Sequence, residues 1–253
     1  MYIITFIDTI SILRSKEQNI WYYINILNIY RRDIEMNLFV DAWWKTIWNW
    51  DKVKDAINTL PGRLGFSKDR ELRFFKLKLD LGTGEVYDEI LGRFLTEREK
   101  YGLYYVLYLY SRAEKEINEV GELITLSQLC PVIHCPMFKE NINAFEITFG
   151  YNPQYLYQAA ELFGFEKIDI ADVAVKIYVL PLVPIVVGIW LGEEGLPPSS
   201  VILFDKSVSN YLDCEASSIL AGVLLARLII ALGKKLDITL KGIKYSYRYQ
   251  CSE

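Results

Sequence analysis

The sequence predicts an α+β fold, in which a helical, aromatic-rich N-terminal segment packs on a body of mixed helices and antiparallel strands. Apolar residues recur at helical spacing in the first quarter of the chain. Farther on, three apolar segments rich in β-branched residues are separated by Pro or Gly, which favours strands of one sheet. Of the 253 residues, 52% are apolar and 24% are charged, which excludes disorder, a collagen-like repeat and a small disulfide scaffold.

Composition and charge divide the chain into three parts. We predict a helical aromatic-rich segment over residues 1–62, an α+β domain over 63–233 and a basic edge strand or tail over 234–253. The net charge of −4 excludes a uniformly basic protein that coats nucleic acid. Acidic residues concentrate in 113–233, which carries six basic and fifteen acidic side chains, whereas the tail carries five basic and two acidic ones.

The N-terminal segment holds five of the six tryptophans within its first fifty positions. Residues 17–60 have helical spacing, and the tryptophans fall on two neighbouring helical faces. A helix that is apolar on both faces must be covered on both, either by a partner protein or flat cofactor, or by the body of this chain. The tryptophans of this candidate partner-binding set are Trp43, Trp44, Trp48 and Trp50.

The end of the N-terminal segment predicts a short helix, and the first part of the domain predicts a hairpin and a longer helix. Asp51 is the expected N-cap of the short helix. Alternation over 72–81, followed by Gly82-Thr83-Gly84, predicts one strand, a turn and a return strand, with the odd-numbered side chains toward the core. Thr96 followed by Glu99 is a capping-box pattern that opens the longer helix.

The remaining elements follow from apolar periodicity and from the positions of Pro and Gly. The predicted elements are an extended piece over 121–129, helices over 136–146 and 153–163, strands over 173–180, 183–191 and 199–205, a buried helix over 215–232 and an alternating tail over 243–249.

No membrane span is predicted. The first segment has no basic residue before its apolar run, which argues against a signal peptide. The two most apolar internal runs, 178–191 and 218–232, are interrupted by prolines and by Arg227, and a bilayer-crossing helix needs about 20 apolar residues. Four cysteines are too few for a secreted scaffold, so a cytoplasmic location is expected, and the Ile- and Tyr-rich composition indicates a thermophile.

The segment from Cys130 to Cys135 carries the sharpest local pattern. The only histidine, His134, lies between two of the four cysteines, on a segment flanked by prolines. Because thiolate and imidazole are preferred ligands of soft metals, these three residues are a candidate metal site that Cys214 or Cys251 could complete. The spacing matches no standard zinc or haem motif, and the alternative is an apolar loop with free thiols or a disulfide.

A second candidate is a set of carboxylates near the last strands and the long helix. Clustered carboxylates bind hard cations or share a proton in acid–base chemistry. Each residue also suits a structural role, since Asp205 precedes turn residues and Asp213 is positioned to cap a helix. The set is Glu193, Glu194, Asp205, Asp213 and Glu215.

The sequence contains no complete catalytic motif. It has no dinucleotide-binding glycine pattern, P-loop, nucleophile elbow or HExxH, and a Ser-His-Asp or Cys-His enzyme would depend on His134. The tail, with Lys244 and Arg248 opposite tyrosines, suits an edge strand defended by charge more than an RNA-binding surface. Nucleic-acid binding is therefore not expected.

From Asp80 onward several motifs occur in a characteristic order. They are DLGTGEVYDEIL, GELITLSQL, and a proline-flanked strand pair that ends in Trp190 and is followed by Glu193-Glu194, Pro197, Leu203-Phe204-Asp205, Tyr211-Leu212 and Glu215. This order resembles the domain of unknown function 3786 family of uncharacterised prokaryotic proteins. The resemblance implies contact with redox or cofactor-carrying proteins, because some members follow a four-cysteine iron–sulfur domain like that of corrinoid iron–sulfur proteins. This chain has a Trp-rich segment in that place.

These observations favour a non-catalytic binding or accessory module that docks onto a redox or cofactor-carrying protein of an anaerobic or thermophilic prokaryote. The first alternative is a protein, enzymatic or not, that binds a soft metal, a tetrapyrrole or a corrinoid through Cys130, His134 and Cys135. The second alternative is a ribosome- or RNA-associated factor that uses the basic tail.

Overall fold

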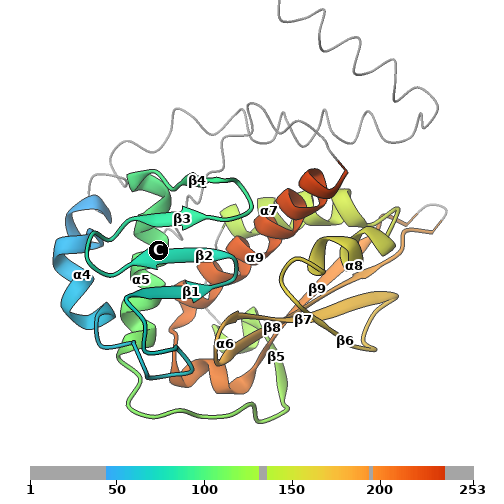
Figure 1. Ribbon diagram of the computed structural model, residues 1–253. Coiled ribbons are helices and arrows are strands. Elements are labelled where there is room, and N and C mark those ends of the chain that lie inside the picture. Colours follow the sequence, from blue (N-terminus) through green and yellow to red (C-terminus); the bar gives the residue numbers. More distant parts are fainter. Residues whose placement is uncertain (1–43, 131–135, 194–195, 237–253) are drawn as a thin grey trace, which may run out of the picture.

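The computed structural model describes residues 44–130, 136–193 and 196–236 and confirms the α+β class (Figure 1). The predictions for residues 1–43 and for the tail beyond 236 lie outside the described residues. The described helices are α4 (Trp50–Ile57), α5 (Glu97–Ser111), α6 (Leu126–Leu129), α7 (Pro136–Phe149), α8 (Gln154–Ala160), the 3-10 helix η3 (Lys206–Asn210) and α9 (Cys214–Lys235). The described strands are β1 (Glu71–Phe74), β2 (Leu77–Asp80), β3 (Val86–Asp88), β4 (Arg93–Phe94), β5 (Leu123–Thr125), β6 (Glu166–Lys167), β7 (Val173–Leu180), β8 (Val183–Trp190) and β9 (Ser199–Asp205).

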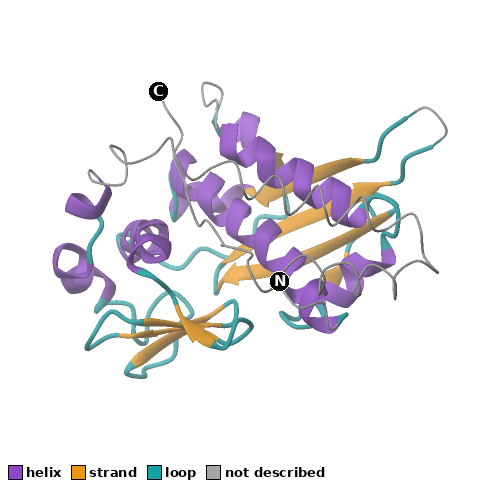
Figure 2. Ribbon diagram, turned by 90° about the horizontal axis from the view of Figure 1, so that it is seen from above, coloured by secondary structure: helices purple, strands orange, loops and turns teal. Residues whose placement is uncertain are grey.

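The larger sheet is antiparallel, with the strand order β5-β9-β8-β7-β6. Its three long strands match the three predicted apolar segments to within one residue. Helices α7, α8 and α9 cover one face of this sheet (Figure 2). The core between the sheet and these helices includes the fully buried side chains of Val175, Ile177, Val187, Phe145, Leu156 and Leu220.

Helix α9 runs through the core. Every residue from 216 to 225 is buried. The positive charges of Lys234 and Lys235 lie in the last turn, where they interact favourably with the negative end of the helix dipole. Among the described residues, α9 is the one helix long and apolar enough to cross a bilayer, but 89% of its most apolar window is buried inside the body. The burial expected for residues 218–232 is therefore confirmed, and Arg227 lies inside that stretch.

The smaller sheet is an antiparallel meander of β1 to β4. The prediction of one strand over 72–81 is wrong, because Phe75 and Lys76 form a two-residue turn in which both have positive φ, 45° and 59°. The turn reverses the chain, so the apolar residues of both short strands, including Leu72 and Leu79, face the core. Such turns usually carry Asn-Gly, so a Phe-Lys pair gave no turn signal.

Two helix starts are set by side-chain caps. Helix α4 begins after Asn49, whose side chain accepts a hydrogen bond from the Lys52 amide, and Asp51 lies in the first turn; the predicted cap at Asp51 is therefore wrong. Helix α5 begins with the predicted capping box, in which the Thr96 amide donates to the Glu99 carboxylate at 2.7 Å. Helix α5 packs against both α4 and α9.

Candidate functional site

The N-terminus of α9 brings together residues from all three groups that the sequence singles out. Asp213 is the N-cap, and its carboxylate accepts hydrogen bonds from the Ala216 amide at 2.9 Å and from the Tyr105 hydroxyl of α5 at 2.5 Å. The next residue, Cys214, forms a disulfide with Cys130. The capping aspartate and the disulfide are therefore adjacent along the chain.

Tyr105 also contacts the tryptophans of the N-terminal segment. Its ring centroid lies 5.5 Å from that of Trp44 and 4.5 Å from that of Trp48. Trp50 packs on α5 in the same way, 5.7 Å from the ring of another tyrosine. These three tryptophans thus pack on the body of the chain, which is the alternative that the sequence left open, while Trp43 lies outside the described residues. Partner binding by this set stays a prediction.

The Cys130–Cys214 disulfide joins the end of α6 to the start of α9, with the two Cα atoms 5.6 Å apart. Cys130 can therefore ligate a soft metal only after reduction. The other two predicted ligands, His134 and Cys135, lie outside the described residues. In the described part of the chain, no group of three or more His, Cys, Asp or Glu residues is arranged to hold a metal ion.

Asp205, at the end of β9, is 2% exposed and holds a neighbouring loop in place. Its carboxylate accepts hydrogen bonds from the amides of Val120 at 3.0 Å, Gly121 at 2.7 Å and Ser207 at 2.9 Å. Burial acts to raise the pKa of Asp205, but hydrogen bonds from Ser207, Val120 and Gly121 outweigh it and hold the pKa below its ordinary value of 3.8. The ionised form of this residue therefore stabilises the fold.

The contribution of Asp205 is expected to depend on pH. Because its folded pKa is lowered, the stabilisation is complete above pH 3.8 and is lost as the pH falls through the folded pKa. Asp205→Asn should lower the free energy of unfolding by about 1–3 kcal/mol at pH 7, and by less at pH 3. Urea unfolding of both proteins at the two pH values measures the difference. An equal loss at pH 7 and pH 3 would contradict the assigned role of the charge.

The remaining carboxylates of the acidic set serve separate elements. Asp213 caps α9, and Glu215 lies in its first turn, where the positive end of the helix favours it. Glu193 is exposed in the β8–β9 hairpin, and Glu194 lies outside the described residues. The described members therefore do not form one carboxylate site.

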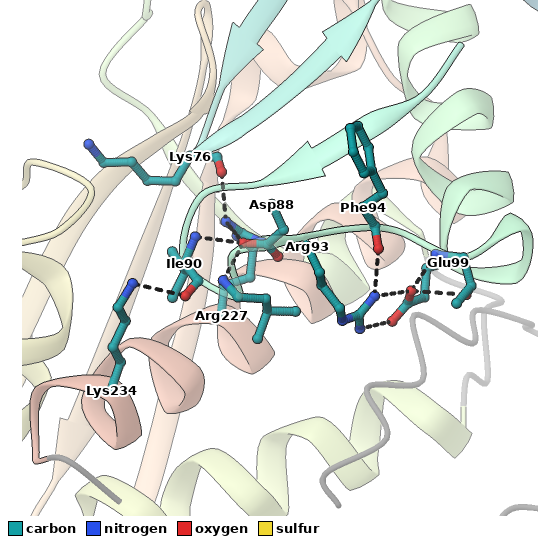
Figure 3. A network of polar contacts seen from close by, with 10 residues as sticks. Lys76, Asp88, Ile90, Arg93, Phe94, Glu99, Arg227 and Lys234 are labelled. Atoms are coloured by element: carbon teal, nitrogen blue, oxygen red, sulfur yellow. Dashed lines mark hydrogen bonds and ion pairs between the residues drawn. The ribbon is translucent and has the colours of Figure 1, made fainter. Parts of the chain in front are cut away.

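Sequence reasoning missed a buried ion pair between α9 and the smaller sheet (Figure 3). Arg227 and Asp88 both have fully buried side chains, and Arg227 Nη1 donates to Asp88 Oδ2 at 2.6 Å. Arg227 Nη2 also donates to the Lys76 carbonyl at 3.3 Å, and Asp88 Oδ1 accepts the Ile90 amide at 2.8 Å. An arginine inside an apolar helix requires a counter-charge, which is a usable signal, but the sequence does not say which carboxylate supplies it.

The same guanidinium contacts the turn between β1 and β2. It lies 5.4 Å from the ring centroid of Phe75 and 5.9 Å from that of Phe163, and these two rings stack at 4.1 Å. Phe75 and Lys76 are the two turn residues with positive φ, a conformation that persists only where the surroundings enforce it. Arg227 therefore fixes this turn through the Phe75 ring and the Lys76 carbonyl.

A second arginine pair lies nearer the surface of the same sheet (Figure 3). Both terminal nitrogens of Arg93 bind the Glu99 carboxylate, at 2.9 and 2.7 Å, and the Arg93 side chain is 40% exposed. This pair joins β4 to the first turn of α5. The Arg93–Glu99 pair is partly exposed and can therefore be compared with the fully buried Arg227–Asp88 pair.

One protein-family model, the domain of unknown function DUF3786, matches residues 65–227. The chain belongs to this family. No curated protein and no solved structure matches the chain. The matched DUF3786 region contains both sheets, both disulfide cysteines and both members of the Arg227–Asp88 pair, whereas the N-terminal tryptophans precede it. The family resemblance noted in the sequence is thereby confirmed, and the DUF3786 description assigns no activity.

Proposed function

We propose that this DUF3786 protein is a non-catalytic binding or accessory module that docks onto a partner protein through the tip of the β8–β9 hairpin. One contrast carries the proposal. The buried carboxylates Asp88 and Asp205 and the buried Arg227 bind groups of the fold itself, whereas large apolar side chains are exposed at the hairpin tip. Exposed apolar clusters with polar neighbours are typical of protein-binding sites.

The hairpin tip comprises residues 190–198 without the undescribed pair 194–195, and it extends from one end of the larger sheet (Figure 1). Trp190, Leu191 and Leu196 are 41%, 43% and 66% exposed. A bridge between Glu193 and Leu196 closes the tip, and the Leu191 amide donates to Asp172 at 2.7 Å. These contacts hold the backbone at Leu191, Glu193 and Leu196, which limits the entropy that these residues lose on binding.

The charge around the tip selects the partner. No Lys or Arg occurs between Lys176 and Lys206, whereas Glu193 lies in the tip and Asp172 contacts it through the Leu191 amide. A complementary surface is therefore apolar at its centre and basic at its rim. We assign the partner to the redox or cofactor-carrying proteins because the family resemblance implies that class.

The test is crosslinking in native-cell extract with the full chain, followed by affinity purification and an absorption spectrum of the captured protein. Leu196→Asp should reduce capture of the partner at least about tenfold, because a buried, unpaired charge at an interface core costs more than 1.4 kcal/mol. The control is Phe94→Ser, which changes an exposed apolar side chain elsewhere, 60% exposed on the smaller sheet, and should leave capture unchanged.

Three results would overturn this function. They are recovery of the chain only as a free monomer across several salt concentrations, equal capture by the Leu196→Asp and Phe94→Ser variants, and a captured protein without any cofactor absorbance. The first two reject the hairpin as a docking site, and the third rejects the partner class.

A further inference from the structure

We propose that the Cys130–Cys214 disulfide is a thiol–disulfide exchange site that accepts two electrons from a dithiol protein, with Cys214 as the sulfur that is attacked. This inference concerns the N-terminus of α9 and does not depend on docking by the hairpin. The two cysteines differ in their exposure to solvent. Cys130 is 4% exposed, whereas Cys214 is partly exposed.

Exposure decides which sulfur reacts first. A thiolate must approach along the line of the S–S bond, so the accessible sulfur is attacked and the enclosed one leaves. Cys130 is enclosed at the end of α6, whereas Cys214 is the first residue of α9. The mixed disulfide therefore forms on Cys214.

The surroundings of Cys214 also favour its release as a thiolate. The sulfur lies at the positive end of a 22-residue helix, which stabilises an anion. The acidic neighbours Asp213 and Glu215 oppose this effect, and the Asp213 carboxylate is directed toward the Tyr105 hydroxyl and the Ala216 amide, from which it accepts hydrogen bonds. Cys214 is thus suited to be attacked when the mixed disulfide forms, and also to leave as a thiolate when the mixed disulfide is resolved.

The exchange balances without a further reactant. The first thiolate of the partner forms a bond to Cys214 Sγ, the Cys130–Cys214 bond breaks, and Cys130 leaves as a thiolate that takes up a proton. The second thiolate of the partner then attacks the partner sulfur of the mixed disulfide and releases Cys214, which is protonated in turn. The partner ends as a disulfide, and this chain has gained two electrons and two protons.

Reduction should loosen the segment that ends at Cys130 and leave the start of α9 in place. Helix α6 has four residues and none is buried, and β5 before it has three residues. The start of α9, in contrast, is also held by the Asp213 cap and by the Tyr105 hydrogen bond, and neither contact involves the disulfide. The segment that loosens is therefore 123–130, while the first turns of α9 stay ordered.

The test uses the full chain with Cys135 and Cys251 replaced by serine, so that one pair of thiols is followed. In this background, Cys130→Ser leaves Cys214 alone and Cys214→Ser leaves Cys130 alone, and each variant is incubated with oxidised glutathione and followed by mass spectrometry. We expect the mixed disulfide to form at least about tenfold faster on Cys214 than on Cys130. Circular dichroism of both variants confirms that each is folded.

A second measurement uses the natural sequence. Dithiothreitol should reduce the Cys130–Cys214 bond faster than the protein unfolds globally, and hydrogen exchange should then rise in residues 123–130 while the first turns of α9 stay protected. Equal glutathione reactivity of the two cysteines would overturn the assignment of Cys214. Reduction no faster than global unfolding would show a purely structural disulfide, and unchanged exchange in 123–130 would refute the release of that segment.

Discussion

Arg227→Met is expected to lower the free energy of unfolding by about 3–5 kcal/mol, because it leaves the Asp88 carboxylate buried without its counter-charge. Both side chains are fully buried, so water cannot replace the lost guanidinium. The methionine retains most of the apolar volume of the arginine stem, which limits the contribution of a cavity. Urea unfolding at pH 7 measures the change.

Two further variants separate the buried charge from other effects. Arg93→Met removes an arginine from a pair that is 40% exposed on the arginine side, and it should cost about 1 kcal/mol or less. The double replacement Arg227→Met with Asp88→Leu removes both buried charges and should be more stable than Arg227→Met alone. A loss below about 1 kcal/mol for Arg227→Met would show that Asp88 is not held by this ion pair.

The parts of the fold that depend on local sequence could be predicted. The strands β7, β8 and β9 are apolar segments with β-branched residues that are separated by Pro or Gly, and α9 is a long, mainly apolar helix after a capping aspartate. In these segments the periodicity, the boundary residues and the cap all indicate the same element. Their positions in the structure match the prediction closely for that reason.

Local reasoning failed where a distant residue determines the conformation. The turn at Phe75 and Lys76 carries no turn residue, and its positive φ angles are held by Arg227, which lies more than 150 positions away in the chain. A strand pattern of alternating residues continues through these two positions, so the sequence indicated one strand instead of two. As a result, every strand residue before the turn is assigned to the wrong face of the sheet.

The roles of single residues in the candidate site could be predicted from the sequence, but their proximity in space could not. Asp213 was expected as a cap and Cys130 as a ligand or a disulfide partner, but their meeting at the N-terminus of α9 depends on contacts that span large separations. Tyr105 and Asp213 are 108 residues apart, and Cys130 and Cys214 are 84 residues apart. Four cysteines allow three complete sets of two disulfides, and spacing alone does not choose among them.

The second large effect concerns that disulfide. Cys214→Ser should lower the free energy of unfolding by about 2–4 kcal/mol under oxidising conditions, because the bond closes a long loop and so restricts the unfolded chain. Denaturant unfolding of the natural protein and of the variant, each with and without dithiothreitol, measures this contribution.

The reductant provides the internal control. Dithiothreitol should bring the stability of the natural protein down to that of Cys214→Ser and should leave the variant itself unchanged, since the same covalent restriction is absent in both. The cap of α9 is formed by the Asp213 side chain and the Ala216 amide, so it survives the replacement of the next residue, and the loss should come from the bond and not from the helix. A variant that is less stable than the reduced natural protein by more than about 1 kcal/mol would instead show that the side chain of Cys214 supports the start of α9 by packing.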